Sequence, residues 1–202
     1  MVDPHIVDLD GNSITPETVI IAYWQRCFPM ADERNGRIAW YRPERRAIIT
    51  WDRFKIPVSL AKVLRKHPFT ITVDRSFPQV MAACAERDST WISRDIEQLY
   101  TELHVRGIAH SVEAWDTNGQ LVGGLYGLQL GSCFAGESMF HRANDASKAC
   151  VVALVARLRE RGFAFLDCQQ QSAHMQRFGA YEISDRTYAG MLAKCHTDVA
   201  WQ

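Results

Sequence analysis

Asp167 and Gln169 are the residues whose types and spacing best suit catalysis. They lie in residues 163–169, which we predict to form a β-strand because the segment is short and mostly apolar. Side chains alternate along a strand, so Asp167 and Gln169 share one face, while Leu166 and Cys168 share the other. A carboxylate and an amide at the end of an apolar strand are costly unless they are hydrogen-bonded or used. The pair therefore either caps neighbouring backbone or belongs to a reaction centre.

Two possible nucleophiles, Ser138 and Cys168, have little support in the sequence. The run at 136–140 has the first half of a G-x-S-x-G turn but lacks its closing glycine. No basic partner for Cys168 is evident. None of the six Cys forms a C-x-x-C pair, and no Cys/His group has zinc spacing. We therefore expect structural thiols in a reducing cytoplasm, with no metal and no cofactor.

Charge is distributed unevenly along a chain whose net charge is zero. Between Arg34 and Lys66 stand ten Lys/Arg and two Asp/Glu, and the remainder carries the compensating negative charge. This asymmetry predicts a face for a polyanion, although a solvated basic surface would leave the same pattern. The N-terminus lacks the features of a signal peptide, and the longest apolar run, residues 149–156, is too short to span a bilayer. We expect a cytoplasmic protein without a membrane partner.

The elements that must position these residues follow from caps and periodicity. With 202 residues, 47% of them apolar, the chain is long enough for one large domain or for one domain with a small appendage. Asn118-Gly119 predicts a hairpin turn. Helices are expected at 16–26, 59–66, 77–86, 95–106 and 145–161, with a further short helix between 169 and 181. Strands are expected at 47–51, 69–73, 109–115, 121–130, 132–135, 163–169 and 181–183. This order predicts an α+β fold.

Five stretches of the sequence resemble the leucyl/phenylalanyl-tRNA–protein transferase family. Together they cover the chain from about residue 15 to residue 192, and their order makes the match specific. The resemblance implies a small N-terminal domain, residues 1–43, and a GNAT-like acyltransferase domain, residues 44–202, with a mixed sheet flanked by helices. The stretches are Phe28-Pro29; Trp40-Tyr41-x-Pro43-x-x-Arg46; Thr90-Trp91-Ile92; the motifs between His110 and Gly127; and Gly136 to Phe140 with Asp145 to Lys148, Leu166 to Gln169 and Phe178 to Ala180.

The resemblance also implies a reaction. Members of this family transfer Leu, Phe and sometimes Met from aminoacyl-tRNA to proteins or peptides that begin with Arg or Lys, and so mark them for proteolysis. Carried over to this chain, Gln169 would accept a hydrogen bond from the attacking amine. Asp167 would polarise Gln169 and hold the cationic N-terminus. Glu137 would bind the Arg or Lys side chain of the acceptor.

The donor needs an apolar pocket and contacts to its tRNA. Pocket candidates lie partly at helical spacings of three and four, although ordinary core positions would show the same pattern. An aromatic platform would stack on the terminal adenine, and cations would meet the phosphates. Where the family often has Trp, this chain has Met30. The pocket candidates are Leu125, Phe134, Val151, Leu154 and Leu158, and the tRNA-binding candidates are Trp91, Met30, Arg42, Arg45 and Arg46.

Two other classes of protein are compatible with parts of this pattern. A GNAT N-acetyltransferase would need a Gln/Arg-x-x-Gly-x-Gly/Ala turn to bind the pyrophosphate of acetyl-CoA, and residues 141–144 do not supply one. An RNA-binding module without catalysis would need the basic segment but not Asp167, Gln169 and Glu137. Binding of acetyl-CoA, or tRNA binding without transfer, would distinguish these alternatives from a transferase.

Overall fold

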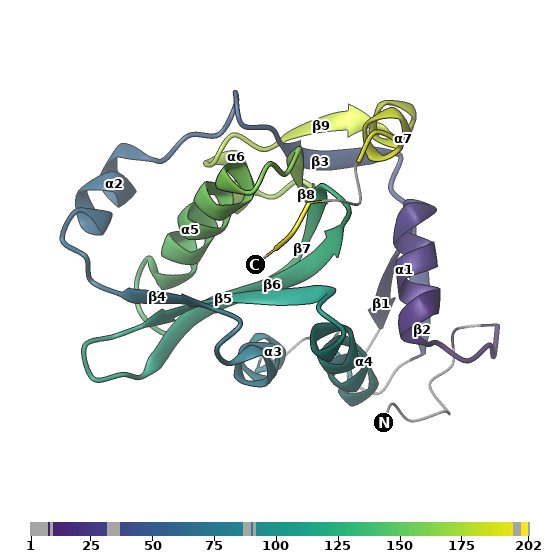
Figure 1. Cartoon of the computed structure of the whole chain (residues 1–202), viewed down its shortest axis with the longest axis horizontal. Helices are drawn as coiled ribbons and strands as arrows, with labels where there is room; N and C mark the ends of the chain where they lie inside the picture. Colours follow the sequence, from purple (N-terminus) through teal and green to yellow (C-terminus); the bar gives the residue numbers. More distant parts are fainter. Residues whose placement is uncertain are drawn as a thin grey trace.

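A mixed sheet of seven strands forms the centre of the molecule in the computed structural model (Figure 1). The structure describes residue 8 and residues 10–31, 37–86, 90, 92–195 and 199–201. A separate hairpin pairs β1 (Phe28–Ala31) with β2 (Ile38–Tyr41). The strands of the large sheet are β3 (Arg45–Ile49), β4 (Thr70–Val73), β5 (Ala109–Trp115), β6 (Leu121–Leu130), β7 (Cys133–His141), β8 (Phe165–Gln169) and β9 (Tyr181–Ser184).

The strand order in the large sheet is β4-β5-β6-β7-β8-β3-β9. β7 and β8 are parallel, whereas the other neighbouring pairs are antiparallel. A parallel pair needs a crossover connection, and α5 provides it. The helices are α1 (Pro16–Trp24), α2 (Val58–Leu64), α3 (Phe77–Ala85), α4 (Arg94–Val105), α5 (Ala146–Glu160), α6 (Ala173–Gln176) and α7 (Asp185–Leu192).

Helices cover both faces of the large sheet and divide the core into two clusters (Figure 1). α3 and α4 cover one face, and α1 packs beside α4. α5 covers the other face, where its apolar residues contact β5, β6 and β7. α7 lies next to β3 and β9 at the far edge of the sheet. The prediction of an α+β fold with a mixed sheet flanked by helices is confirmed.

The N-terminus of α5 is held close to β6 by a glycine. A Cβ atom on Gly123 would lie 2.6 Å from the Cβ of Ala146, a distance at which the helix would have to move. Asp145, which directly precedes α5, has φ of 66° and makes no side-chain cap hydrogen bond. Its carboxylate instead accepts a hydrogen bond from Lys148 at 2.5 Å. The helix start is therefore fixed by close packing and by an ion pair.

Most predicted elements are confirmed, and the differences have identifiable causes. β7 continues to His141, beyond the predicted end at residue 135, because residues 136–141 pair with β6. α7 was not predicted, although Ser184 caps it by accepting from the backbone N–H of Thr187. The hairpin of β1 and β2 forms between the helix predicted at 16–26 and the strand predicted at 47–51. Among the described residues, no helix combines the length and apolar character that crossing a bilayer requires.

Candidate active site

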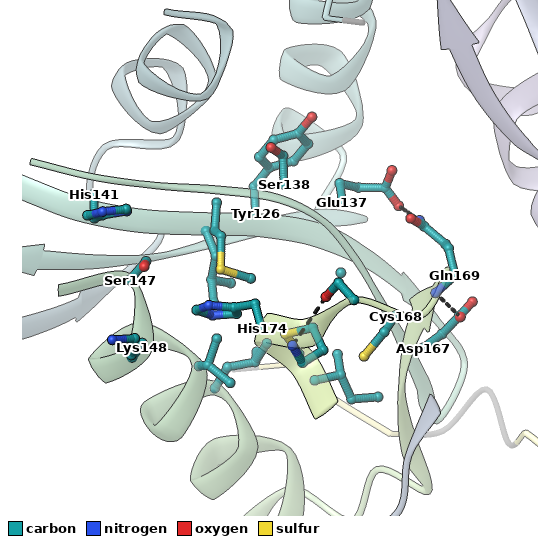
Figure 2. Close-up of a pocket in the computed structure, with 18 of the residues that line it drawn as sticks. Tyr126, Glu137, Ser138, His141, Ser147, Lys148, Asp167, Cys168, Gln169 and His174 are labelled. Carbon is teal, nitrogen blue, oxygen red and sulfur yellow. Dashed lines mark hydrogen bonds between the residues drawn. The ribbon is translucent and has the colours of Figure 1, made fainter. Parts of the chain in front are cut away.

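A cavity of about 890 Å³ opens where β7 and β8 separate (Figure 2). The pairing of these strands ends at Ala135 and Asp167, and α5 and α6 supply further walls. Glu137 and Gln169 lie at one side of the cavity, and Ser147 and Lys148 lie at the other (Figure 2). Apolar side chains also line the cavity: Leu125, Met139, Val151, Leu154, Leu166 and Met175.

The carboxylate of Asp167 is fully buried and accepts hydrogen bonds from three residues. Its two oxygens accept from Nε of Arg46 at 2.9 and 3.1 Å, and one accepts from Nη2 at 2.7 Å. Tyr188 donates its hydroxyl at 2.7 Å, and the backbone N–H of Gln169 donates at 2.8 Å. With 0% of Asp167 exposed, direct contact with the ammonium group of an acceptor is not compatible with the structure. Asp167 instead holds the backbone from which Gln169 projects.

Arg46 is the counterion of Asp167 and lies in the interior, with 1% of its surface exposed. Burial opposes its charge, but the neighbouring Asp167 carboxylate outweighs burial and raises the pKa of the guanidinium. Arg46 also donates to the carbonyl of Arg26 and lies over the rings of Phe28 and Tyr188. The expectation that Arg46 contacts tRNA phosphates is therefore wrong, because the pair has no access to solvent.

Gln169 ends β8 in a strained backbone conformation. Its φ is 58°, the left-handed region that non-glycine residues seldom occupy, and the register with β3 shifts at Ala47. The side-chain amide donates from Nε2 to Oε1 of Glu137 at 2.8 Å. Because the nitrogen of the amide faces Glu137, its oxygen is turned away from that carboxylate. The strained turn and the Glu137 contact together fix the orientation of the amide.

Glu137 projects from β7 into a cluster of hydroxyl groups. Tyr23 donates to Oε1 at 2.5 Å, and Tyr100 donates to Oε2 at 3.3 Å. Burial raises the pKa of the Glu137 carboxyl to about 7, the hydrogen bond from Tyr23 opposes this rise, and the charge of Asp167 adds to it. Burial, together with the charge of Glu137, also raises the pKa of both tyrosines, so their hydroxyls stay protonated and donate. Glu137 is therefore close to half ionised at neutral pH.

Tyr23 and Tyr100 are functional candidates that the sequence analysis missed. Tyr23 comes from α1, in the N-terminal region, and Tyr100 comes from α4. Both are fully buried, and their hydroxyls lie 3.3 Å apart. A buried Tyr needs a partner for its hydroxyl, which is the signal that would have suggested a polar neighbour. Nothing in the sequence indicates that this neighbour is Glu137.

The predicted pocket residues divide into two groups. Leu125, Val151 and Leu154 line the cavity. Phe134 and Leu158 do not: both are fully buried in the core, where the ring of Phe134 lies 5.2 Å from that of Trp201. Helical spacing identified the correct face of α5, but it could not show where along the helix the cavity ends.

None of the predicted tRNA contacts that the structure describes lines the cavity. Arg42 and Arg45 are exposed and form ion pairs with Asp185 at 2.6 Å and with Glu182 at 3.2 Å. Met30 is half-buried in β1, and Trp91 lies outside the described residues. Further along the basic segment, exposed cations on and around α2 have no ion-pair partner in the described part of the chain: Lys55, Lys62, Arg65 and Lys66.

Two other chemistries find little support near the cavity. Burial raises the pKa of the Cys168 thiol, which keeps it protonated at neutral pH, as suits a structural residue. In the described part of the chain, Asp74, His104 and His110 are close enough to share a metal ion, but they do not line the cavity. Nδ1 of His110 lies 2.8 Å from Asp74, and Nδ1 of His104 lies 2.8 Å from the carbonyl of Ala109. These hydrogen bonds account for the group as a structural network.

Family models and curated relatives identify one family. The family model described as leucyl/phenylalanyl-tRNA protein transferase matches residues 48–193, and the model of its N-terminal domain matches residues 12–44. A leucyl/phenylalanyl-tRNA--protein transferase of Rubrobacter xylanophilus is 49% identical over 90% of this chain and 94% of its own length. A protein of the same name from Akkermansia muciniphila is 50% identical over 91% of this chain and 97% of its own length. Among solved structures, FemX resembles the fold with a TM-score of 0.53 and 11% identity, over 89% of this chain and 68% of FemX.

Proposed function

We propose that this chain, which belongs to the leucyl/phenylalanyl-tRNA–protein transferase family, moves an apolar amino acid from its tRNA to the α-amino group of proteins that begin with Arg or Lys. The observation that carries the proposal is a cavity with apolar walls that ends at the paired side chains of Gln169 and Glu137. Such walls suit the side chain of Leu, Phe or Met. The paired carboxylate and amide suit a cationic acceptor.

Gln169 is the residue that we assign to the attacking amine. The ester between an amino acid and tRNA is already activated, and an α-amine has a pKa of about 7.7–8.0, so a useful fraction is neutral at pH 7. The amide oxygen of Gln169 accepts an N–H of this amine and aims its lone pair at the ester carbonyl. A C–N bond then forms, the bond to the ribose oxygen breaks, and the proton lost by nitrogen is balanced by the proton that the ribose oxygen gains.

Asp167 acts in this proposal as a positioning residue. It holds the backbone N–H of Gln169 at 2.8 Å and is itself fixed by the buried guanidinium of Arg46. Since the left-handed conformation of Gln169 is strained, a strong interaction is needed to maintain it. The pair of Arg46 and Asp167 supplies that interaction, and so keeps the amide of Gln169 within hydrogen-bonding distance of Glu137.

Glu137 binds the cationic side chain of the acceptor's first residue. Tyr23 and Tyr100 hold the carboxylate from the side of α1 and α4. A carboxylate has about four lone-pair sites, so it still accepts from a ligand after three protein hydrogen bonds. Because binding of Arg or Lys requires the anion, the raised pKa of Glu137 links acceptor binding to pH near neutrality.

The basic segment binds the body of the donor tRNA. Lys62, Arg65 and Lys66 present exposed cations on and just after α2, whereas Arg42 and Arg45 are partly neutralised by acidic partners. Phosphate contacts supply affinity without reading sequence, which suits an enzyme that uses several tRNAs. Aminoacyl-tRNA and cleaved protein N-termini are cytoplasmic molecules, so we place the protein in the cytoplasm. There it would mark proteins for N-degron proteolysis.

A transfer assay tests the proposal. The protein is incubated with labelled Leu-tRNA and with otherwise identical peptides that begin with Arg, Lys, Glu or Ala. Label should pass to the Arg and Lys peptides and not to the Glu and Ala peptides. Transfer to the Glu peptide would show that the role of Glu137 is wrong. Acetylation of the same peptides by acetyl-CoA, without transfer from tRNA, would favour an acetyltransferase instead.

A further inference from the structure

We propose that the side of the cavity opposite Gln169 binds a phosphate group, and that the last phosphodiester of the donor tRNA is its source. The site consists of Ser147, Lys148, His174 and the first turn of α5 (Figure 2). The identity of this source rests on the proposed function. That the ligand is an anion is inferred from the side chains and charges at the site itself.

Ser147 is a nearly buried residue whose hydroxyl the protein does not use. The residue is 4% exposed, and it lines the cavity. Its side chain makes no hydrogen bond to any other part of the chain that the structure describes. The hydroxyl is the polar end of a nearly buried side chain on the cavity wall, so a ligand or water in the cavity is left to hydrogen-bond with it. Its position on the cavity wall makes a ligand in the cavity the natural partner.

The surrounding groups are mostly hydrogen-bond donors. Ser147 lies in the first turn of α5, a helix of 15 residues, where backbone N–H groups and the helix dipole favour an anion. Lys148 donates to Asp145 at 2.5 Å, and an ammonium group has two further protons to donate. Asp145 is the anion that faces this group. It neutralises part of the charge of Lys148 and occupies one of the three donors of that ammonium group.

His174 reports the sign of the electrostatic potential at this side of the cavity. Burial lowers its pKa, and the positive charges of Lys148, Arg177 and His141 lower it further. Burial is the larger cause of this shift, so it is the presence of three cationic neighbours, and not the shift itself, that indicates a positive local potential. Nε2 of His174 is buried without a hydrogen-bond partner in the described part of the chain. A bound anion would be attracted by this potential.

Phosphate is the anion that the donor brings to this place. The amino acid is esterified to the last ribose of the tRNA, and the 5′ oxygen of that ribose carries the last phosphodiester. When the ester carbonyl lies at Gln169, this phosphate is therefore one ribose away, within the same continuous cavity. Its binding opposite the catalytic amide would fix the donor at two points and orient the ester.

The test uses two stable donor analogues, 3′-deoxy-3′-(L-phenylalanylamino)adenosine with and without a 5′-phosphate. Calorimetry on the full chain gives the Kd of each. For the wild-type protein, the 5′-phosphate should tighten binding about tenfold, as expected for charge-assisted hydrogen bonds. In the double variant Ser147→Ala, Lys148→Gln this advantage should disappear, while the Kd of the unphosphorylated analogue stays the same. Lys148→Arg should keep the advantage, as should the control Lys194→Gln, which removes the same charge from an exposed position after α7.

Free phosphate is distinguished by a competition arm. If inorganic phosphate at millimolar concentration binds the wild-type protein but not the double variant, and the 5′-phosphate gives no advantage, the site takes free phosphate. Equal Kd values for the two analogues without phosphate binding would overturn the inference, as would an advantage that survives in the double variant. Leu-tRNA transfer without a phosphate advantage would defeat this inference alone. Phosphate binding through Ser147 and Lys148 without any transfer would defeat the proposed function alone.

Discussion

The pH dependence of transfer should be set by Glu137, because burial raises its pKa to about 7. Binding of a cationic acceptor requires the ionised form. With a pKa of about 7, about one tenth of the molecules carry the anion at pH 6 and about nine tenths at pH 8. The contribution of this group to kcat/KM for an Arg-starting peptide should therefore rise about tenfold between these two pH values.

The assay must separate Glu137 from the acceptor, whose α-amine also titrates near this range. Glu137→Gln keeps the shape of the side chain and removes its charge, while the amine of the peptide is unchanged. The ratio of wild-type to variant kcat/KM therefore cancels the amine. This ratio should increase about tenfold from pH 6 to pH 8 and level off above. A ratio that stays constant over this range refutes the reasoning that Glu137 acts as an anion with a raised pKa.

Three further predictions concern stability and tRNA binding. Folded Glu137 holds its proton more tightly than an unfolded carboxyl with a pKa of 4.5, so its contribution to stability falls as pH rises through the window from 4.5 to about 7. Glu137→Gln should therefore raise the free energy of unfolding at pH 8 by up to about 3 kcal/mol and have little effect at pH 4.5, as measured by urea unfolding. Asp167→Asn leaves the buried cation of Arg46 without its counterion and should lower the free energy of unfolding by about 3–5 kcal/mol, whereas a loss below about 1 kcal/mol would contradict the buried pair. Replacing Arg65 and Lys66 with Ala should flatten the log–log salt dependence of tRNA binding by about 1.4–1.8, and an unchanged slope would place the tRNA elsewhere.

The sequence predicted the parts of the site that depend on local pattern. Alternation along a strand placed Asp167 and Gln169 on one face, and the structure shows both on the side of Arg46 and Glu137. Helical spacing found Val151 and Leu154 on the face of α5 that lines the cavity. These relations follow from the repeat of one element, so neighbouring elements are not needed to derive them.

The parts that failed depend on contacts between distant segments. Arg46 is the fifth Lys/Arg of the basic segment that begins at Arg34, a position that suggests a solvated surface. It nevertheless pairs with Asp167, 121 positions away, in the interior. The hydroxyl of Tyr23 meets Glu137, 114 positions away. Charge and aromatic character are visible in the sequence, but burial is decided by the sheet order, which places β3 beside β8. A buried polar cluster of this kind becomes evident once the strands are assembled.

The most direct test of catalysis at this site is the single-turnover rate of a Gln169→Ala variant. Labelled Leu-tRNA is bound first, and a saturating Arg-starting peptide is then added. Gln176→Ala, an exposed glutamine at the end of α6 outside the cavity, serves as the matched control. Transfer by Gln169→Ala should slow by about 10²–10⁴-fold, while the Kd for Leu-tRNA stays within about twofold of the wild-type value. A near-normal rate at saturating acceptor would contradict the assignment, and catalysis would then rest on the proximity of the two substrates.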